Sequence, residues 1–594
     1  MLRPFKLLPK KFIYIILLTF IGIGFEVYCT ILIPEQIGNL IKLFDTPTTL
    51  VLSDVRNRSI ILAIYVGASI IIDIVVFFLV NYISSNCARY MRLAVFKKVN
   101  KLSIEKIYSI TVPSLISRTI EDCKIAETGI QSVLGVGLIA PITMVGGIVF
   151  LFVKFSNHAN FWWLFSLIGG ALLLLTLGTI IMFKKNTPLF MKLRNLNDQV
   201  NDVSRENISG MRVIRAHNAQ KFQMRKFDKI SDDIKTHRSS AYTYISLTWP
   251  VTDFFVQIIP VCIYWLGGVF MKNQQDAIIG LTYADLLEIS QLGVTILMGF
   301  TLMLISSVSI PQSIVSIKRV NEILDLKIDM KDPLKPVTSF NTTGKIEFKN
   351  VNFKYEGSEQ NILTNISFTI KKGQTLGIVG PNGSGKSTLI SLIPRFFDPK
   401  KGEILINDVN IKKINLKMLR SKIGYVGQKS FLFSGSIKEN ISYGLSTPPQ
   451  DEHLNFISRN AEALEFIDTL PMKYNSVVSQ NANNFSGGQK QRLSIARALA
   501  INPEILIFDD SFSALDLKTD KVLRGKLQNK FKHVTKIIVA QRVNTILDAD
   551  KIIVLDDGKI IGMGTHQQLL KNCPLYCDIT SSQLEQKEVA TNEK

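Results

Sequence analysis

A long apolar run near the start of the chain, residues 12–33, contains one charged residue, Glu26. As a helix rising 1.5 Å per residue, a run of about 22 residues crosses a hydrocarbon core of about 30 Å. A cleaved signal peptide is the alternative, but its apolar region is shorter and ends in a small-residue cleavage site. Pro34 and Glu35 follow here instead. The run therefore predicts a first membrane span.

Five more apolar runs of similar length follow, near residues 59–83, 129–153, 161–183, 243–271 and 276–308. They account for a composition with 47% hydrophobic and only 20% charged residues, where soluble proteins have about 25% charged residues. The chain of 594 residues is also too long for one hydrophobic core. We predict an α-helical membrane domain of six transmembrane helices over residues 1–320, a linker over 321–342, and a second domain over 343–594.

The basic residues predict the orientation in the membrane, because positively charged loops stay in the cytosol. Four precede the first span, eight lie between the second and third, and about thirteen lie between the fourth and fifth. The three alternate loops hold about five together. We therefore expect a multi-pass protein of an inner or plasma membrane, bacterial by its Lys-, Asn- and Ile-rich composition, with its N-terminus and second domain in the cytosol. This bias explains much of the net charge of +21, so nucleic-acid binding is not predicted.

Two cytosolic connections, of about 45 and 60 residues, are far longer than ordinary loops. In the second, apolar residues such as Val200, Val203, Ile208 and Met211 recur at three to five residues, which is typical of a helix. We expect spans two to five to continue into the cytosol as long helices, each pair ending in a short turn. They are either solvated hairpins or levers that touch the second domain, and the presence of that domain favours levers.

The second domain contains a phosphate-binding loop in a strand–loop–helix context. A β-branched stretch over 375–379 leads into Gly380, Pro381, Asn382, Gly383, Ser384, Gly385, Lys386, Ser387 and Thr388, and a helical pattern follows. This is the pattern G-x-x-x-x-G-K-[ST] in the context it requires. The backbone N–H groups surround phosphates, Lys386 reaches the terminal phosphates and the Ser387 hydroxyl ligates Mg²⁺. The loop predicts nucleotide binding.

Three further motifs fit the same site. Asp509 ends a strand that looks buried, as expected of the acid that holds Mg²⁺. Gln428 follows another strand pattern, IGYVG. The signature, Phe485, Ser486, Gly487, Gly488 and Gln489, leads directly into a helix, whose N-terminus attracts anions. A Ser-Gly-Gly turn alone is common.

The chain resembles an ATP-binding-cassette exporter half-transporter of the type IV kind. The resemblance rests on the order of its features: six spans, Tyr355, the phosphate loop, Gln428, the signature, Asp509 and the stretch 513–516. The resemblance covers almost the whole chain. It implies an α/β P-loop cassette that pairs head to tail with a second cassette, each ATP lying between one subunit's phosphate loop and the other's signature.

The resemblance also implies residue roles. Tyr355 would stack on adenine, for which a strand tyrosine at a sheet edge is the alternative. Asp516 would belong to the D-loop, and Ser387, Gln428 and Asp509 would hold Mg. Residues 113–118 with Asp122, and residues 206–216, resemble the loops around two coupling helices, the second of which crosses to the opposite cassette in that family.

Two positions depart from the family, and both concern hydrolysis. After Asp509 the family places a glutamate that polarises the attacking water, but this chain has Asp510, whose carboxylate would lie about 1.5 Å farther away. A displacement of about 1 Å can cost on the order of 10²-fold in rate. Gln541 stands where the family has histidine; its amide can still hydrogen-bond a phosphate, but it cannot take up a proton or become charged. Since the signature is nearly intact, we predict the degenerate-site subunit of a heterodimer, in which the partner supplies the glutamate and the histidine.

Five acidic residues lie within the predicted spans: Glu26, Asp73, Asp253, Asp285 and Glu288. Such residues are costly in a membrane and are therefore candidates for function. They would suit cationic amphipathic substrates. The alternatives are hydrogen bonds between spans, gate contacts, or a position near the outer interface. Cys573 and Cys577 predict a surface helix rather than a metal site.

The function predicted from these features is ATP-driven export of amphipathic compounds, whether drugs, lipids or peptides, out of the cytosol. The expected cofactors are ATP and Mg, and the expected partners are a second half-transporter and membrane lipid. A homodimeric lipid or peptide exporter is one alternative. An ATP-gated channel is another, although the sequence shows no regulatory insert or extra domain of the kind that a channel would use.

Overall fold

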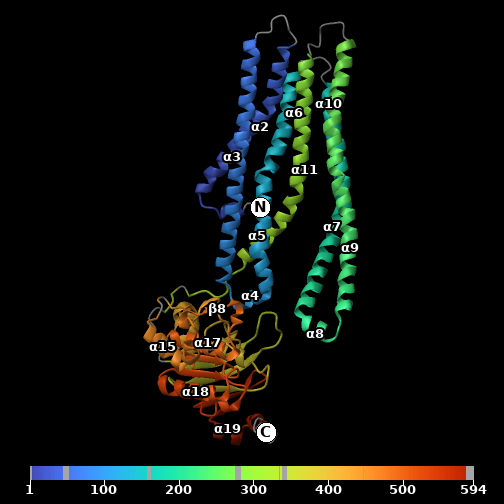
Figure 1. Cartoon of the computed structure of the whole chain (residues 1–594). Helices are drawn as coiled ribbons and strands as arrows, with labels where there is room; N and C mark the ends of the chain where they lie inside the picture. The colour runs from blue at the N-terminus through green and yellow to red at the C-terminus, as the bar shows by residue number, and fades with distance from the viewer. Residues whose placement is uncertain are drawn as a thin grey trace. The chain divides into compact units, whose positions relative to one another are not determined.

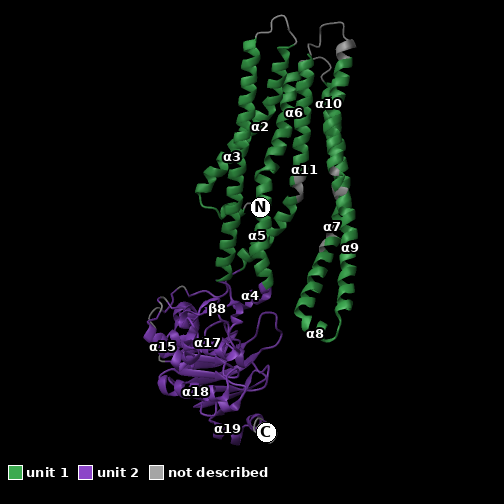
Figure 2. Cartoon of the chain, viewed as in Figure 1, with its two compact units in different colours: residues 1–100, 113–326 green, residues 101–112, 327–594 purple. Residues whose placement is uncertain are grey.

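A computed structural model describes residues 3–44, 52–156, 162–273, 282–333, 335–337, 344–445, 447 and 449–582. The chain divides into two compact units, residues 1–100 with 113–326 and residues 101–112 with 327–594 (Figure 2). The first unit is helical, and the second holds the strands that the structure describes. The predicted fold class, a six-helix membrane domain followed by an α/β domain, is confirmed.

Long helices lying side by side form the first unit (Figure 1). Its described helices are α1 (Arg3–Lys6), α2 (Lys11–Lys42), α3 (Leu52–Val99), α5 (Val112–Leu134), α6 (Val136–Phe155), α7 (Trp162–Ser209), α8 (Met211–Ala216), α9 (Gln220–Ser246), α10 (Thr248–Asn273) and α11 (Tyr283–Asp325). Six helical stretches in the described residues are long and apolar enough to cross a membrane. Helices suit the hydrocarbon core of a membrane because each helix satisfies its own backbone hydrogen bonds.

The six candidate spans are Lys11–Lys42, Leu52–Val99, Val112–Phe155, Trp162–Leu189, Trp249–Val269 and Tyr283–Asp325. The predicted starts of the fourth span at 161 and of the sixth at 276 lie outside the described residues. Large apolar side chains on these helices stay exposed, such as Ile71, Phe78 and Leu173. An exposed apolar surface of this kind suits contact with lipid.

Two helices of 48 residues, α3 and α7, extend well beyond a membrane core, because 48 residues span about 70 Å. A short helix follows each of them, α4 (Ile104–Ile110) and α8 (Met211–Ala216). Residues 113–118 and Asp122, which resemble part of the loops around two coupling helices, lie in the first half of helix α5. Asp122 is buried there and accepts a hydrogen bond of 2.8 Å from Ser316 Oγ of α11. The short helix lies just before this stretch.

A six-stranded sheet, in the order β12-β11-β3-β10-β9-β6, forms the centre of the second unit. Its strands are β3 (Thr375–Val379), β6 (Ile423–Val426), β9 (Ile505–Asp509), β10 (Thr535–Val539), β11 (Lys551–Asp556) and β12 (Lys559–Gly564). All neighbouring pairs are parallel except β11 with β12. Such parallel strands are buried on both faces, which explains their continuous β-branched runs.

A four-stranded antiparallel sheet, in the order β2-β1-β4-β5, packs beside the central sheet. Its strands are β1 (Ile346–Phe353), β2 (Leu363–Ile370), β4 (Lys401–Ile406) and β5 (Val409–Asn410), and a separate pair is β7 (Gly435–Ser436) with β8 (Val477–Val478). Because side chains alternate along a strand, Ile505 and Ile507 join the core shared with the four-stranded sheet. Leu506 and Phe508 join a second core with the helices.

Short helices cover the sheets of the second unit. The α-helices are α4 (Ile104–Ile110), α12 (Lys386–Ser391), α13 (Leu416–Ser421), α14 (Ile437–Ile441), α15 (Asp451–Asn460), α16 (Leu464–Asp468), α17 (Gly487–Ala500), α18 (Leu517–Lys530) and α19 (His566–Asn572). The 3₁₀ helices are η2 (Ile411–Lys413), η3 (Lys473–Asn475), η4 (Gln480–Ala482) and η5 (Val543–Thr545). Helix α11 of the first unit ends at Asp325, inside the segment predicted as a linker from 321.

Candidate functional site

Four parallel strands bring the predicted nucleotide motifs to one edge of the central sheet. β3 runs into the phosphate loop at Gly380, and β9 ends on Asp509. β6 leads to Gln428, and β10 leads to Gln541. The carboxyl ends of parallel strands share one edge, and the crevice outside that edge is where open α/β sheets bind their ligands. The topology therefore gathers motifs that are up to 161 residues apart, from Gly380 to Gln541.

Backbone geometry explains two glycines of the phosphate loop. A Cβ on Gly380 would lie 1.9 Å from the carbonyl oxygen of Leu555, so a side chain has no room there. Gly385 caps α12 with φ of +96°, in the region that glycine adopts without strain. The buried Ser384 Oγ has no hydrogen-bond partner among the described residues. Such groups normally have a partner, and a phosphate oxygen would supply one.

The ammonium of Lys386 turns back onto the loop. Its Nζ donates to the carbonyl oxygens of Gly380 at 2.8 Å and Pro381 at 2.7 Å. Burial lowers the pKa of Lys386, while Asp510 and Asp509 act in the opposite direction. Phosphate oxygens would be stronger acceptors than these neutral carbonyls, because both partners would then be charged. The lysine is therefore held where a bound phosphate can recruit it.

Asp509 and Ser387 form a contact suited to a divalent cation. Ser387 Oγ donates to Asp509 Oδ1 at 2.8 Å. Burial raises the pKa of Asp509, and neighbouring Asp510 adds to the shift. A hydroxyl and a carboxylate in contact provide two hard oxygen ligands of the kind that Mg²⁺ prefers, so these residues fit the metal.

Tyr425 is a neighbour of this contact that the sequence analysis did not identify. Its hydroxyl lies 3.5 Å from Asp509 Oδ2, and burial raises the pKa of Tyr425 to about 12. The tyrosine is the third residue of β6, which pairs with β9. A signal was available in the sequence, because Tyr425 precedes Gln428 by three residues.

Asp510 lies next to Gln428. Gln428 Nε2 is 3.4 Å from Asp510 Oδ2. Asp510 has φ of +48°, and two hydrogen bonds hold this backbone: its N–H donates to Val539 O at 3.0 Å, and Ser513 Oγ donates to its carbonyl at 2.8 Å. The position of the carboxylate is therefore set by β10 and by the segment that follows β9. Gln541 lies two residues past the end of β10 and is exposed.

The signature caps α17. Ser486 Oγ accepts from Gln489 N, and the Gln489 side chain accepts from Ser486 N at 2.9 Å, which is a capping box. Phe485 is buried, whereas a Cβ on Gly487 would meet nothing within 4 Å. In the described residues, none of the hydrogen bonds of Ser486 or Gln489 reaches the phosphate loop of the same chain.

Asp516, which the resemblance assigns to the D-loop, caps the next helix, α18, by accepting from Thr519 N at 2.9 Å. This hydrogen bond lowers the pKa of Asp516. The segment before it lies near the signature, since a Cβ on Gly488 would be 3.5 Å from Ala514 O. The structure thus places the signature beside the D-loop.

Tyr355 follows β1 and is half-buried. Its hydroxyl is 3.0 Å from Thr388 Oγ1 of the phosphate loop. Its ring meets Phe353 and Phe397 edge to face, with centroids 5.0 and 5.3 Å apart. Contact with the phosphate loop places Tyr355 beside the nucleotide motifs.

Two of the predicted membrane acids have basic partners near the ends of α2, α6 and α11. Lys42 Nζ lies 2.7 Å from Asp285 Oδ1. Lys154 Nζ lies 2.6 Å from Glu288 Oε1 and 2.8 Å from Glu35 Oε1. The Glu288 side chain is fully buried. This geometry favours the inter-span alternative for Asp285 and Glu288.

The other three membrane acids make no ion pair within the described part of the chain. Glu26 on α2 is half-buried, and its Oε2 has no hydrogen-bond partner there. Asp73 on α3 and Asp253 on α10 are exposed. They stay candidates for contact with a substrate.

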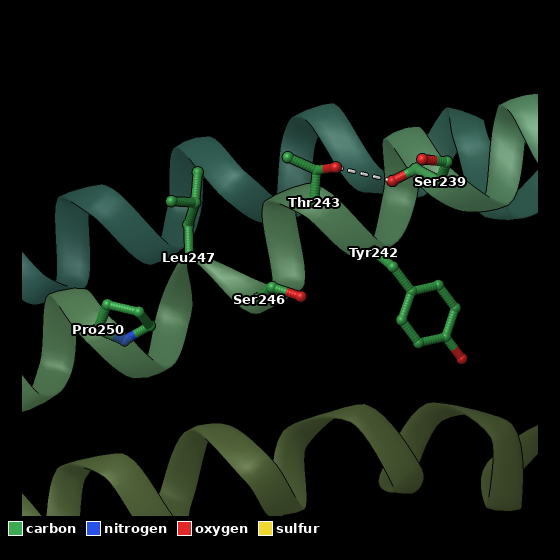
Figure 3. Close-up of a pocket in the computed structure, with 6 residues that line it drawn as sticks. All are labelled: Ser239, Tyr242, Thr243, Ser246, Leu247 and Pro250. Atoms are coloured by element: carbon green, nitrogen blue, oxygen red, sulfur yellow. Dashed lines mark hydrogen bonds between the residues drawn. The ribbon is translucent and has the colours of Figure 1, made fainter.

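A hollow of about 490 Å³ lies in the first unit, where α9 meets α10 (Figure 3). Its lining consists of Ser239, Tyr242, Thr243, Ser246, Leu247 and Pro250. Thr243 Oγ1 donates to Ser239 O at 2.9 Å, so that hydroxyl is satisfied within its own helix. None of the nucleotide motifs lines this hollow.

Comparisons with known proteins agree with the geometry. The model of the ABC transporter transmembrane region matches residues 12–288, and the ABC transporter model matches residues 363–513. An uncharacterized ABC transporter ATP-binding protein of Mycobacterium tuberculosis is 32% identical over 89% of both chains. A Bacillus subtilis protein, named as a probable multidrug resistance ABC transporter ATP-binding/permease protein, is 36% identical over 68% of this chain and 67% of its own.

A solved structure is similar over nearly the whole chain. It is described as a bacterial Atm1-family ABC exporter with ATP bound, and it aligns with a TM-score of 0.79 and 23% identity. The alignment covers 96% of this chain and 98% of that one. At this identity the likeness concerns the fold.

Fold and site together define a membrane transporter driven by a nucleotide. The chain belongs to the ABC transporter family, as a half-transporter with one membrane domain and one ATP-binding cassette. It is thus a multi-pass membrane protein with bacterial homologues, its cassette implies an ATP-hydrolysing translocase, and a half-transporter implies a dimer partner. The resemblance to an ABC half-transporter is confirmed, while export and the degenerate site stay predictions.

Proposed function

We propose that this chain is the degenerate-site subunit of a heterodimeric exporter, and that its own site binds MgATP but hydrolyses it slowly. The observation that carries the proposal is the contrast within one sheet edge. Lys386, Ser387 and Asp509 have the contacts expected of a binding site, while the two positions for hydrolysis hold Asp510 and Gln541.

Binding and hydrolysis depend on different atoms here. The phosphate loop and Lys386 would hold the phosphates, and Ser387, Asp509 and Gln428 would hold Mg²⁺, which neutralises phosphate charge. Hydrolysis also needs a group that orients water, and such groups lose effect steeply with distance. Asp510 is one methylene shorter than glutamate and is held by Gln428 at 3.4 Å. Gln541 can donate a hydrogen bond to phosphate but cannot carry a charge.

The signature supports a partner with a better site. Ser486 caps α17, Gly487 and Gly488 are its first two residues, and the hydrogen bonds of Ser486 do not reach this chain's phosphate loop in the described residues. They are therefore available to a nucleotide bound by another subunit. We propose that the partner is a second half-transporter in the same inner or plasma membrane. Its own ATP site would carry a glutamate and a histidine at the positions of Asp510 and Gln541.

The proposed substrates are amphipathic compounds. One relative is named for multidrug resistance, and Glu26, Asp73 and Asp253 are acids on spans without an ion pair in the described residues. Drugs, lipids and peptides all fit this chemistry. Transport assays in reconstituted vesicles with a cationic dye, a labelled lipid and a labelled peptide would distinguish these three substrate classes.

The experiment that tests the proposal compares the two sites of the assembled transporter. Asp510→Ala is expected to lower steady-state ATPase only modestly, whereas Ala at the equivalent acid of the copurified partner should nearly abolish it. Lys386→Ala is the control that removes ATP binding from this chain. An equal collapse for both acids would contradict the asymmetry and favour the homodimeric alternative.

A further inference from the structure

A short helix that the sequence analysis passed over, α4, contacts the cassette beside Tyr355. Residues 101–112 belong to the same compact unit as residues 327–594 (Figure 2). Lys106 Nζ of α4 donates to Glu356 Oε2 at 2.7 Å. The backbone N–H of Glu356 donates to Glu105 Oε1. Both contacts fall on the residue that directly follows Tyr355.

The Glu105 contact acts on the peptide that Tyr355 and Glu356 share. The N–H of Glu356 and the carbonyl of Tyr355 lie in one rigid plane, so an acceptor for that N–H orients the Tyr355 backbone. The carbonyl oxygen of the same peptide, Tyr355 O, points the other way within this plane and accepts from Ser358 N at 3.2 Å. The plane is therefore held through both of its polar groups.

The Tyr355 side chain is held from another direction. Its hydroxyl contacts Thr388 of the phosphate loop at 3.0 Å, and its ring packs against Phe353 and Phe397. Ile104 of α4 packs on the same apolar core. The tyrosine thus lies between the phosphate loop and α4, with both fixing its position.

Helix α4 is itself anchored to the cassette. Ser103 caps the helix and its Oγ donates to Asp329 Oδ2 at 3.3 Å. The hydrogen bond to Glu356 raises the pKa of Lys106, and Asp329 and Glu105 add to this effect. The lysine thus lies among three carboxylates, and it offsets the repulsion between Glu105 and Glu356.

We infer that Glu105 and Lys106 are positioning residues for the purine base, acting through the Tyr355–Glu356 peptide. The inference rests on the proposed stacking of Tyr355 on adenine. In the chain, α4 lies between α3 and α5 of the membrane unit.

The contacts of Glu105 and Lys106 with Glu356 are more than a surface ion pair in one respect. Exposed ion pairs contribute little on average, and Glu356 is exposed. The amide contact of Glu105 instead bears on backbone geometry, so Glu105 should matter more than Lys106. That order of effects separates the inference from a purely electrostatic account.

The test compares two ligands that differ in the base, on the full chain in lipid nanodiscs. Dissociation constants are measured for MgATP and for magnesium tripolyphosphate, which has no base. Glu105→Ala should weaken MgATP binding about three- to tenfold and leave tripolyphosphate binding unchanged. Glu105→Gln, whose amide oxygen can still accept from Glu356 N, should recover most of the affinity. Lys106→Ala should have a smaller effect, and Lys101→Ala, an exposed lysine of the same segment, should have none.

Tyr355→Ala separates two assumptions: that Tyr355 stacks on adenine, and that Glu105 acts through Tyr355. It should weaken MgATP binding alone, and adding Glu105→Ala to it should cause no further loss, because both changes act through one contact. If Tyr355→Ala weakens MgATP binding but Glu105→Ala does not, α4 has no role in placing the base. Equal losses for both ligands after Glu105→Ala would also overturn the inference. If Tyr355→Ala leaves MgATP binding unchanged, the stacking assignment itself fails.

Discussion

One methylene separates Asp510 from the glutamate that the family places at this position. The backbone at Asp510 is fixed by Val539 and Ser513, and its carboxylate is 3.4 Å from Gln428 Nε2. The chain cannot easily move the carboxylate toward the phosphate side, because the same residue lies in a left-handed conformation between two hydrogen bonds. The length of the side chain therefore decides where the carboxylate reaches.

This reasoning predicts a gain of function. Asp510→Glu combined with Gln541→His should raise the ATPase rate of the isolated chain by about tenfold or more, since both groups needed for hydrolysis are then present. Phosphate release in nanodiscs measures the rate. Asp510→Asn with Gln541→His is the matched control and should stay slow. A double variant no faster than the parent would show that these two positions do not limit hydrolysis.

At the scale of elements, buried charge joins the membrane helices. Lys154 of α6 pairs with Glu35 of α2 and with Glu288 of α11. Gly38 leaves room for this arrangement, because a Cβ there would lie 2.9 Å from Glu288 Oε2. Lys154 is partly exposed but Glu288 is fully buried, so removing the cation leaves an uncompensated buried charge, which costs more than the pair contributes.

We therefore expect Lys154→Met to destabilise the protein by about 3–5 kcal/mol, since Glu288 would be left buried without its cation. Thermal unfolding in detergent measures the change as a lower midpoint. Adding Glu288→Gln should recover much of the loss, and Arg58→Met, which removes an exposed charge from α3, should have little effect. If Lys154→Met were as stable as the parent, the three charges would not link these helices.

The sequence predicted elements better than the contacts between them. Apolar length predicted the spans, and short β-branched runs predicted strands before the phosphate loop, before Gln428 and at Asp509, because both signals are local. The partner of Lys106 lies 250 residues away, and the partner of Glu288 lies 134 residues away. No local pattern carries such a pairing. The sequence did not predict the short helix α4 for a different reason: its seven residues are too few for a periodic signal.

At the scale of the whole molecule, one chain holds half of each nucleotide site in the proposed arrangement. Its phosphate loop and Asp509 gather at one sheet edge, while its signature caps α17 and lies beside the D-loop. In the described residues, the side-chain hydrogen bonds of Ser486 and Gln489 stay within the signature. A site that combines a phosphate loop with a signature thus calls for a second subunit, in agreement with a half-transporter.

Gly488→Asp tests whether the signature of this chain acts on the nucleotide bound by the other subunit. A Cβ on Gly488 meets only Ala514 O at 3.5 Å and Leu515 at 3.9 Å, so the variant should fold. The added carboxylate would repel the phosphates held by the other subunit, where donors must approach the charge of the transferring group. We expect ATPase and transport by the assembled transporter to be abolished while ATP still binds at Lys386, as measured by photolabelling of this chain. Gly487→Ala, whose Cβ meets nothing within 4 Å, is the steric control within this chain. Loss of binding at Lys386 with continued hydrolysis at the partner's site would contradict the head-to-tail arrangement, because the signature would then serve the nucleotide of its own chain.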